Sequence, residues 1–361
     1  MNTRPLTLCK EFETIPKQIT GFISVVKEET LMSIQEKRFC VMLFAFFILL
    51  PYSAFSGTLI ERNTMKAPDG RLRYFHYYVP DRLQSKPAVV VLLHGGSQDY
   101  SQILKQDSAQ SEWLKISDEK GFLLIIPNGV DPGTGSASGS NQHWNDCRAD
   151  ADDVETGADD VGFVNKLIDW ALLKYRIDPS RVYATGASNG GMMSYRLVDE
   201  LSHRIAAVAA FVANRPQNSE CTAPRNPTSI FICNGTKDTW MPWNGGQVIK
   251  GGAVISAQAT RDFWIEHNSA VLSQTKKYRD LDSTDSSTVK SETYSSGLEG
   301  SEVMFYTVTG GGHTIPGIAH TLNPVVELIV GPQNHDIEGA RQAWNFLSRQ
   351  TLGSVNFRMD L

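Results

Sequence analysis

The pentapeptide GASNG at residues 186–190 is the strongest chemical signal in the sequence. It lies between a strand predicted over Arg181 to Thr185 and a helix predicted over Met192 to Leu201, the setting in which G-x-S-x-G presents a nucleophilic serine. Glycines flank the serine because so tight a turn leaves no room for larger side chains beside neighbouring backbone. The helix dipole favours an anionic intermediate at the same place. Ser188 is therefore the candidate nucleophile, with a simple tight turn as the alternative.

A serine hydroxyl needs a base within hydrogen-bond reach and a third group that orients the base. In folds that present G-x-S-x-G between a strand and a helix, the acid follows the serine along the chain, and the histidine comes last. Asp238 lies in a turn after the strand predicted over Ser229 to Cys233. His313 ends the stretch GGGH after the last predicted strand, Val303 to Val308. Each residue alone could be an ordinary loop residue, but their order and placement agree, so we predict a triad with Ser188.

A second signal is the sequence LHGG at residues 93–96, which ends a continuous aliphatic run. This is where the fold builds half of its oxyanion hole, and glycines let backbone N–H groups approach a substrate closely. We predict that the N–H groups of Asn189 and Gly96 donate to the oxyanion. His94 is expected to orient the loop without transferring a proton.

The elements that position these groups alternate between strand and helix patterns, which is typical of a mainly parallel sheet covered on both faces. The polar stretch from Asn268 to Gly300 is expected to be a connecting strand and loops, so we predict one α/β-hydrolase catalytic domain over residues 57–361. Further strands are predicted over residues 73–79, 88–93, 122–126 and 205–212, and further helices over 108–120, from 159 to before 178, over 256–267 and over 337–347.

Composition limits the classes of partner. The chain has 361 residues, 41% of them hydrophobic, and a net charge of −5, so it offers no basic footprint for nucleic acid or an anionic membrane. Neither a G-K-[ST] loop nor an H-E-x-x-H pair occurs, and no cofactor or metal is predicted. The acidic stretch Asp146 to Asp160 leaves two alternatives open: a cation site, or a solvated loop whose last carboxylates begin a helix.

The N-terminal region predicts export. The apolar run from Phe39 to Leu50 follows two basic residues and is too short to cross a bilayer, but it has the length of a signal-peptide core. Residues 1–56 are therefore interpreted as an N-terminal extension and signal peptide, with translation starting at Met32. The mature chain is expected to begin near Gly57 and to be secreted or periplasmic. A buried helix is the alternative. After cleavage we expect no membrane association.

Three cysteines remain in such a mature chain. An oxidising compartment favours one disulfide, and we predict Cys147 with Cys221 because both lie in polar, loop-like sequence. Cys233 ends an apolar run and is expected to be buried. Three free thiols are the alternative.

Four blocks carry a family resemblance: VVVLLHGG, GASNGGMMSYRL, CNGTKDTWMPWNGG and GGGHTIPG. Together they resemble the secreted polyhydroxybutyrate depolymerase and feruloyl esterase family of α/β-hydrolases, in which Ser188, Asp238 and His313 take the triad positions. Two positions depart from the family pattern. Asn234 stands where the family usually has histidine, and Ile315 stands where it often has tryptophan.

The resemblance implies hydrolysis of hydroxyalkanoate oligomers, of feruloyl or acetyl groups, or of short-chain esters. From the residues we expect an acyl-enzyme on Ser188 and a small-molecule or oligomeric ester as the substrate. Trp144, Trp240 and Trp243 could form an aromatic wall around the acyl group, with ordinary burial as the alternative. A catalytically silent ligand-binding relative and a serine peptidase of the same fold are the alternative functions.

Overall fold

A ten-stranded sheet forms the centre of the structure, a computed structural model that describes residues 56–151, 157–249 and 251–353. All of these residues fall within one compact unit, Phe55–Leu361. The predicted signal peptide and the Met32 start lie outside the described residues. The strands are β1 (Thr58–Lys66), β2 (Leu72–Val79), β3 (Val89–Leu93), β4 (Leu123–Pro127), β5 (Val182–Ala187), β6 (Ala207–Phe211), β7 (Ser229–Gly235), β10 (Val271–Lys277), β11 (Thr288–Ser295) and β12 (Val303–Thr309).

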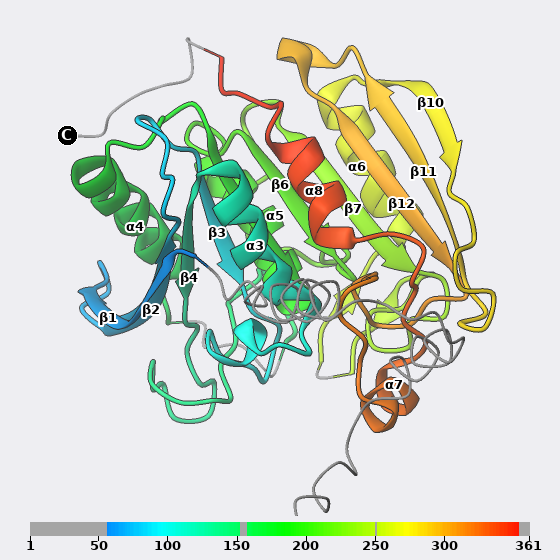
Figure 1. Cartoon of the computed structure of the whole chain (residues 1–361), viewed down its shortest axis with the longest axis horizontal. Helices are drawn as coiled ribbons and strands as arrows, with labels where there is room; N and C mark the ends of the chain where they lie inside the picture. The colour runs from blue at the N-terminus through cyan, green and yellow to red at the C-terminus, as the bar shows by residue number, and fades with distance from the viewer. Residues whose placement is uncertain (1–55, 152–156, 250, 354–361) are drawn as a thin grey trace, which may run out of the picture. The chain divides into compact units, whose positions relative to one another are not determined.

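The strand order is β1-β2-β4-β3-β5-β6-β7-β12-β11-β10 (Figure 1). Neighbours from β4 to β12 in this order run parallel, whereas the pairs at both ends of the sheet are antiparallel. Two short strands, β8 (Gly246–Gln247) and β9 (Ala253–Val254), pair separately. Because parallel strands need crossover connections, the central strands alternate with helices along the chain, as the sequence predicts.

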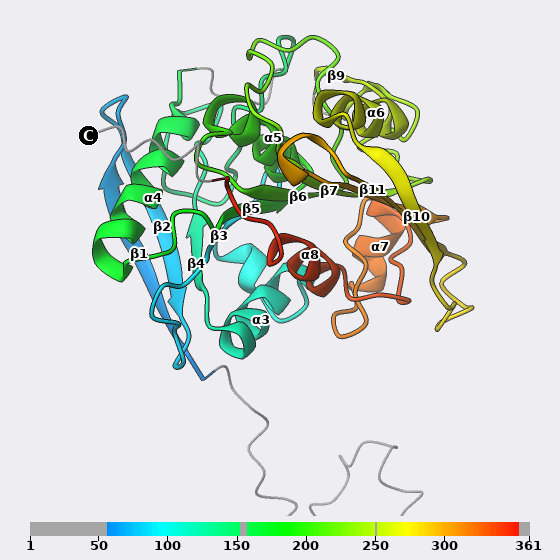
Figure 2. The ribbon, with the colours of Figure 1, turned by 90° about the horizontal axis from the view of Figure 1, so that it is seen from above.

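Helices cover both faces of this sheet. They are α3 (Glu112–Lys120), α4 (Asp160–Tyr175), α5 (Asn189–Leu201), α6 (Ala257–Asn268), α7 (Pro324–Val330) and α8 (Gly339–Leu347). Helices α4, α5 and α6 pack on one face, and α3 and α8 on the other (Figure 2). The buried strand β3 shows why its sequence is continuously aliphatic: Val89 and Val91 belong to the first core, and Val90 to the second. Successive side chains of a strand point to opposite faces, so both must be apolar.

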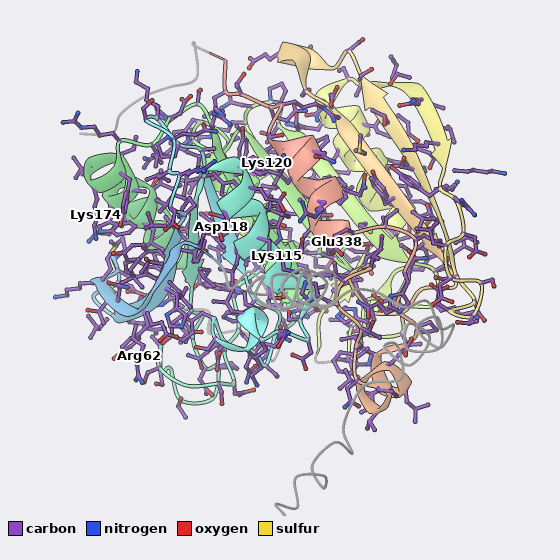
Figure 3. The ribbon with its side chains drawn as sticks, viewed as in Figure 1. Arg62, Lys115, Asp118, Lys120, Lys174 and Glu338 are labelled. Atoms are coloured by element: carbon purple, nitrogen blue, oxygen red, sulfur yellow. A yellow bond between two sulfur atoms is a disulfide. The ribbon has the colours of Figure 1, made fainter. Side chains whose placement is uncertain are left out.

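Helix α3 is tied to the antiparallel end of the sheet by a polar contact. The Tyr78 hydroxyl on β2 donates to Asp118 on α3 at 2.7 Å. Figure 3 shows Asp118 on α3 together with Lys115 and Lys120. Burial and this carboxylate together raise the pKa of the Tyr78 phenol well above its ordinary value, so the hydroxyl stays a donor.

Two parts of the fold differ from the sequence prediction. Strand β1 was not predicted, and the segment expected to hold one connecting strand contains both β10 and β11. Every residue of β10 is exposed, so its sequence VLSQTKK carries none of the apolar alternation that reveals a half-buried strand. Helix α5 also begins at Asn189, three residues before the predicted start, because Gly190 and Gly191 are part of its first turn.

No helix among the described residues combines the length and apolarity that a membrane span requires.

Candidate active site

Ser188 occupies the tight turn that its motif predicts. It follows β5 and precedes the first residue of α5, with φ +55° and ψ −124°, a backbone conformation that non-glycine residues rarely adopt. Its N–H donates to the Phe211 carbonyl oxygen at 2.9 Å, which fixes the turn against β6. A Cβ on Gly190 would collide with the His94 carbonyl oxygen, and one on Gly186 would lie 2.6 Å from Gly190. The flanking glycines are thus required by close backbone packing.

Asp238 and His313 meet as predicted. His313 Nδ1 lies 2.7 Å from Asp238 Oδ2, and both side chains are largely buried. The other carboxylate oxygen, Oδ1, accepts the N–H groups of Trp240 at 2.9 Å and Met241 at 2.8 Å. These bonds hold the carboxylate in one orientation, so Nδ1 of the imidazole carries the proton and Nε2 is left as the basic nitrogen.

Neighbouring strands bring these two residues together. Asp238 follows β7 and His313 follows β12, and the two strands are parallel partners. Between them the Lys237 N–H donates to the Gly311 carbonyl oxygen at 2.9 Å. A Cβ on Gly235 would collide with that same oxygen. The glycine-rich sequence before His313 therefore allows the two loops to touch.

Ser188 and His313 both line a cavity of about 590 Å³. Among the described residues the two side chains form no hydrogen bond with each other. Hydrogen bonds of this kind are often long or poorly aligned before substrate is bound. The structure therefore brings the three predicted triad residues to one site, with the acid–base pair already formed.

Gly96 and Asn189 line the same cavity. A Cβ on Gly96 would lie 3.5 Å from the Asn189 Cβ, so the two main chains are adjacent. Neither main-chain N–H donates to an acceptor within the described residues, as expected for the first residue of a helix and for a loop amide directed at a ligand. Two free donors beside Ser188 are what a developing oxyanion needs.

His94 has both ring nitrogens bound to backbone. Its Nδ1 donates to the Gly95 carbonyl oxygen at 2.7 Å, and its Nε2 accepts the Gly129 N–H at 2.9 Å. Complete burial lowers the pKa of His94 to about 3, which keeps the ring neutral. This arrangement agrees with the predicted role of orienting the loop after β3.

Of the three tryptophans predicted to line the pocket, only Trp240 does so. Its ring stacks on that of His313, with centroids 5.5 Å apart. The prediction was wrong for the other two. Trp144 is fully buried and donates from Nε1 to the His94 carbonyl oxygen at 2.9 Å. Trp243 packs on Phe305 of β12 and against the first core, with ring centroids 5.9 Å apart. Nearness to Asp238 in sequence did not indicate which way the Trp243 ring points.

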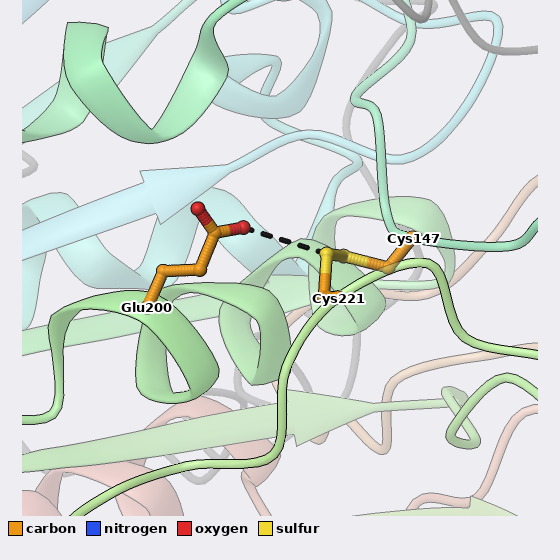
Figure 4. A group of neighbouring side chains, drawn as sticks. All are labelled: Cys147, Glu200 and Cys221. Carbon is orange, nitrogen blue, oxygen red and sulfur yellow. Dashed lines mark hydrogen bonds between the residues drawn. A yellow bond between two sulfur atoms is a disulfide. The ribbon is translucent and has the colours of Figure 1, made fainter.

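The predicted disulfide between Cys147 and Cys221 is present, and Cys233 is a buried free thiol as predicted. Figure 4 shows the disulfide beside Glu200, whose Oε1 lies 3.4 Å from Cys221 Sγ. Because the two sulfurs are bonded to each other, this cluster offers no pair of thiolates to a metal ion.

The last carboxylates of the acidic stretch, Asp159 and Asp160, begin helix α4, as the sequence predicts. Asp159 caps α4 by accepting the Gly162 N–H at 2.7 Å. Asp160 does more than was predicted: its fully buried carboxylate pairs with Arg73 at 2.7 Å and accepts the Asn145 N–H at 2.9 Å. Residues 152–156, with three of the acidic side chains, lie outside the described residues.

The two departures from the family pattern have local roles. Asn234 is buried at the end of β7, where its side chain accepts the Ala213 N–H at 3.2 Å and donates to Asn214 Oδ1 at 2.8 Å. It therefore joins the end of β7 to the loop after β6. Ile315 lines the cavity and gives that wall an aliphatic surface.

Comparison with known proteins adds to this geometry. Residues 78–270 match the model of the phospholipase/carboxylesterase family. A bifunctional acetylxylan esterase/xylanase of Neocallimastix patriciarum is 30% identical over 176 residues, which are 49% of this chain and 23% of that protein. Feruloyl esterase B of Thermothelomyces thermophilus is 34% identical over 195 residues, 52% of this chain and 55% of that protein. The matched segment thus spans less than two thirds of either relative.

A solved structure, acetyl xylan esterase from Aspergillus awamori, matches with a TM-score of 0.51 over 81% of this chain and 99% of that protein, at 15% identity. At this identity the likeness shows the fold alone, and it confirms the predicted α/β-hydrolase fold. The family match covers more than half of the sequence. The chain therefore belongs to the phospholipase/carboxylesterase family of α/β-hydrolases, enzymes that hydrolyse carboxylic esters.

Proposed function

We propose that the chain is a serine esterase in which Ser188 attacks the ester carbonyl carbon. His313 Nε2 takes the hydroxyl proton, and Asp238 orients the imidazole and stabilises its charged form. The alcohol leaves with the proton that His313 returns, and water then releases the acid from the acyl-enzyme by the same route. The observation that carries the proposal is the 2.7 Å contact between Asp238 and His313, because His313 lines the same cavity as Ser188.

The tetrahedral intermediate of this reaction carries a negative oxygen. The main-chain N–H groups of Gly96 and Asn189 are the donors that we assign to it, because both are adjacent, uncommitted and beside Ser188. Loss of one such donor typically costs about a hundredfold to a thousandfold in rate.

The cavity wall supports a substrate with an apolar group next to the ester. Aliphatic residues form part of this wall: Val248, Ile249, Ile315, Leu322, Val326 and Val330. The relatives named above are an acetylxylan esterase/xylanase and a feruloyl esterase. We propose acetyl, feruloyl, short-chain or hydroxyalkanoate esters as the substrate class, with the Trp240 ring beside the reacting carbonyl.

Two alternative functions are compatible with the sequence motifs. A silent ligand-binding relative would have no use for a buried acid–base pair beside a strained serine, so the geometry favours an enzyme. A serine peptidase would use the same three residues, and the named relatives favour ester over amide hydrolysis.

We also propose that the protein acts outside the cytoplasm. The Cys147–Cys221 disulfide supports this, because structural disulfides persist in oxidising compartments. It agrees with the signal peptide that the N-terminal sequence predicts.

A fluorophosphonate probe tests the nucleophile. We expect a covalent adduct on Ser188 in the folded protein and none on the Ser188→Ala variant, detected by peptide mass spectrometry. Methyl ferulate, p-nitrophenyl acetate and hydroxybutyrate oligomers, assayed side by side, then identify the acyl group. Absence of an adduct at Ser188 in correctly folded protein would refute the proposed function.

A further inference from the structure

A loop segment from His143 to Arg148 contacts the first proposed oxyanion donor. The Ser97 N–H donates to His143 Nε2 at 3.0 Å. The nearest atoms to a Cβ built on Gly96 are those of the His143 ring, at 3.0 Å. The His143 side chain therefore packs directly against the loop that presents the Gly96 N–H.

The same segment binds the second proposed donor from the other side. The Trp144 N–H donates to Asn189 Oδ1 at 2.8 Å, and Asn189 Nδ2 donates to the Trp144 carbonyl oxygen at 2.8 Å. Asn189 Nδ2 also donates to Asp146 Oδ2 at 2.7 Å. All three bonds involve buried groups, so the Asn189 side chain has one orientation and its main chain is held with it.

The Asp146 carboxylate, which accepts the hydrogen bond from Asn189 Nδ2, is itself held in place. Arg148 Nε lies 2.9 Å from Asp146 Oδ1, and its Nη2 lies 2.9 Å from Oδ2, a bidentate ion pair between two buried side chains. The guanidinium also donates to the Gly251 carbonyl oxygen. Cys147, the residue between the two charges, is tied to Cys221 by the disulfide. Bidentate pairs of this kind restrict geometry as well as contributing energy.

We propose that Asp146 is a positioning residue for the oxyanion hole, acting through the side chain of Asn189. This inference rests on the proposed esterase function. Asp146 accepts a hydrogen bond from the Asn189 side chain and does not line the cavity, whereas its partner Arg148 does. Removal of Asp146 takes away one of the two acceptors of the Asn189 amide and the carboxylate that Arg148 pairs with, so the first turn of α5 is held less firmly relative to Gly96. A shift of the donor affects the transition state more than the ground state, because the charge on the oxygen develops only there.

The chain offers a matched control. Asp199 and Arg215 form a second buried, bidentate ion pair, with distances of 3.0 and 3.1 Å. Neither residue lines the cavity. The variant Asp199→Ala thus removes a similarly buried carboxylate from its guanidinium, near the opposite end of α5 from Asn189.

The experiment compares Asp146→Ala with Asp199→Ala in the full chain, with p-nitrophenyl acetate as substrate. For Asp146→Ala we expect kcat to fall about tenfold to a hundredfold while KM changes less than about threefold. The affinity for an alkylboronic acid, which forms a tetrahedral adduct with the serine, should fall by a similar factor. For Asp199→Ala we expect kcat within about twofold of the parent, although both variants melt at lower temperature.

Four outcomes are informative. If the two variants have equal kcat, or if the loss of activity in Asp146→Ala comes from a raised KM, the role of Asp146 is overturned. The esterase function is then left intact. A parent chain that hydrolyses none of the esters overturns the proposed function and this inference together. If Asp146→Ala does not fold, Asn189→Ala removes the same side-chain bonds without leaving a buried charge. The same fall in kcat and in boronic acid affinity then supports the inference, and unchanged values reject it.

Discussion

The buried imidazole of His94 makes the folded protein sensitive to mild acid. Its ring is fully buried, with Nδ1 donating to the Gly95 carbonyl oxygen and Nε2 accepting the Gly129 N–H. Protonation of Nε2 would therefore replace this hydrogen bond with a repulsive contact between two N–H groups. Burial lowers its pKa from an ordinary 6.5 to about 3. At pH values between about 3 and 6.5, the His94 ring is therefore protonated in the unfolded chain and neutral in the folded chain. Stability from this group is complete above pH 6.5 and is lost as the pH falls toward 3.

The size of the effect follows from the two pKa values. Each pH unit below 6.5 removes about 1.4 kcal/mol from the free energy of unfolding until the folded pKa is reached. Between pH 7 and pH 4.5 the loss from His94 is therefore about 2–3 kcal/mol. For a domain of this size, that corresponds to a fall in melting temperature of roughly 5 °C.

The variant His94→Gln isolates this contribution. Burial also lowers the pKa of His76, so other groups add slope of the same sign, and the difference between parent and variant is the quantity to measure. We expect the variant to melt at lower temperature at pH 7 but to lose roughly 5 °C less than the parent between pH 7 and 4.5. Calorimetry at several pH values measures this. Parallel curves for the two proteins, or an NMR titration of the His94 ring near pH 6, would refute the reasoning.

The triad acid, the disulfide and the cavity wall each give a further expectation. Asp238→Asn should lower kcat by roughly a thousandfold to ten-thousandfold with little change in KM, because His313 loses the acceptor that sets its tautomer. Steady-state kinetics measure this, and a loss under tenfold contradicts the role of Asp238 as the triad acid. Cys221→Ser should lower the free energy of unfolding by about 2–5 kcal/mol in urea titration, since the Cys147 bridge spans 74 residues, and an unchanged midpoint speaks against this. Val326→Asp should raise KM roughly tenfold for p-nitrophenyl octanoate but not for the acetate, and equal effects on both esters exclude an apolar subsite there.

Sequence reasoning succeeded where the chemistry has a local signature. The turn at Ser188 and the loop at His313 each follow a buried strand and require glycine for close backbone contact, so composition and spacing reveal them. Asp238 was found because the fold dictates which strand it follows. The structure places these groups beside one another, as the order of the motifs along the chain predicts.

The sequence was less informative about side-chain direction and long-range pairing. Trp144 is fully buried, and Trp243 packs against the core although it follows Asp238 by five residues; nothing in their neighbours indicates this. Asp146 and Arg148 lie in an acidic stretch that suggested a cation site or a solvated loop. Their pairing depends on the backbone bend at Cys147, where φ is +71°, and no composition pattern marks such a residue.

The geometry of the site has two different sources. Ser188, Asp238, His313 and Gly96 follow β5, β7, β12 and β3, strands of one parallel region whose carboxyl ends meet at the same edge. The sheet therefore positions these four groups without further help. The segment 143–148 belongs to the long connection between β4 and α4, and it lies outside the ten strands of the main sheet; isolated bridges join His143 to Val130 and Arg148 to Ser219. A disulfide and a buried ion pair are concentrated in this segment, and they supply the rigidity there that the sheet supplies to the other groups.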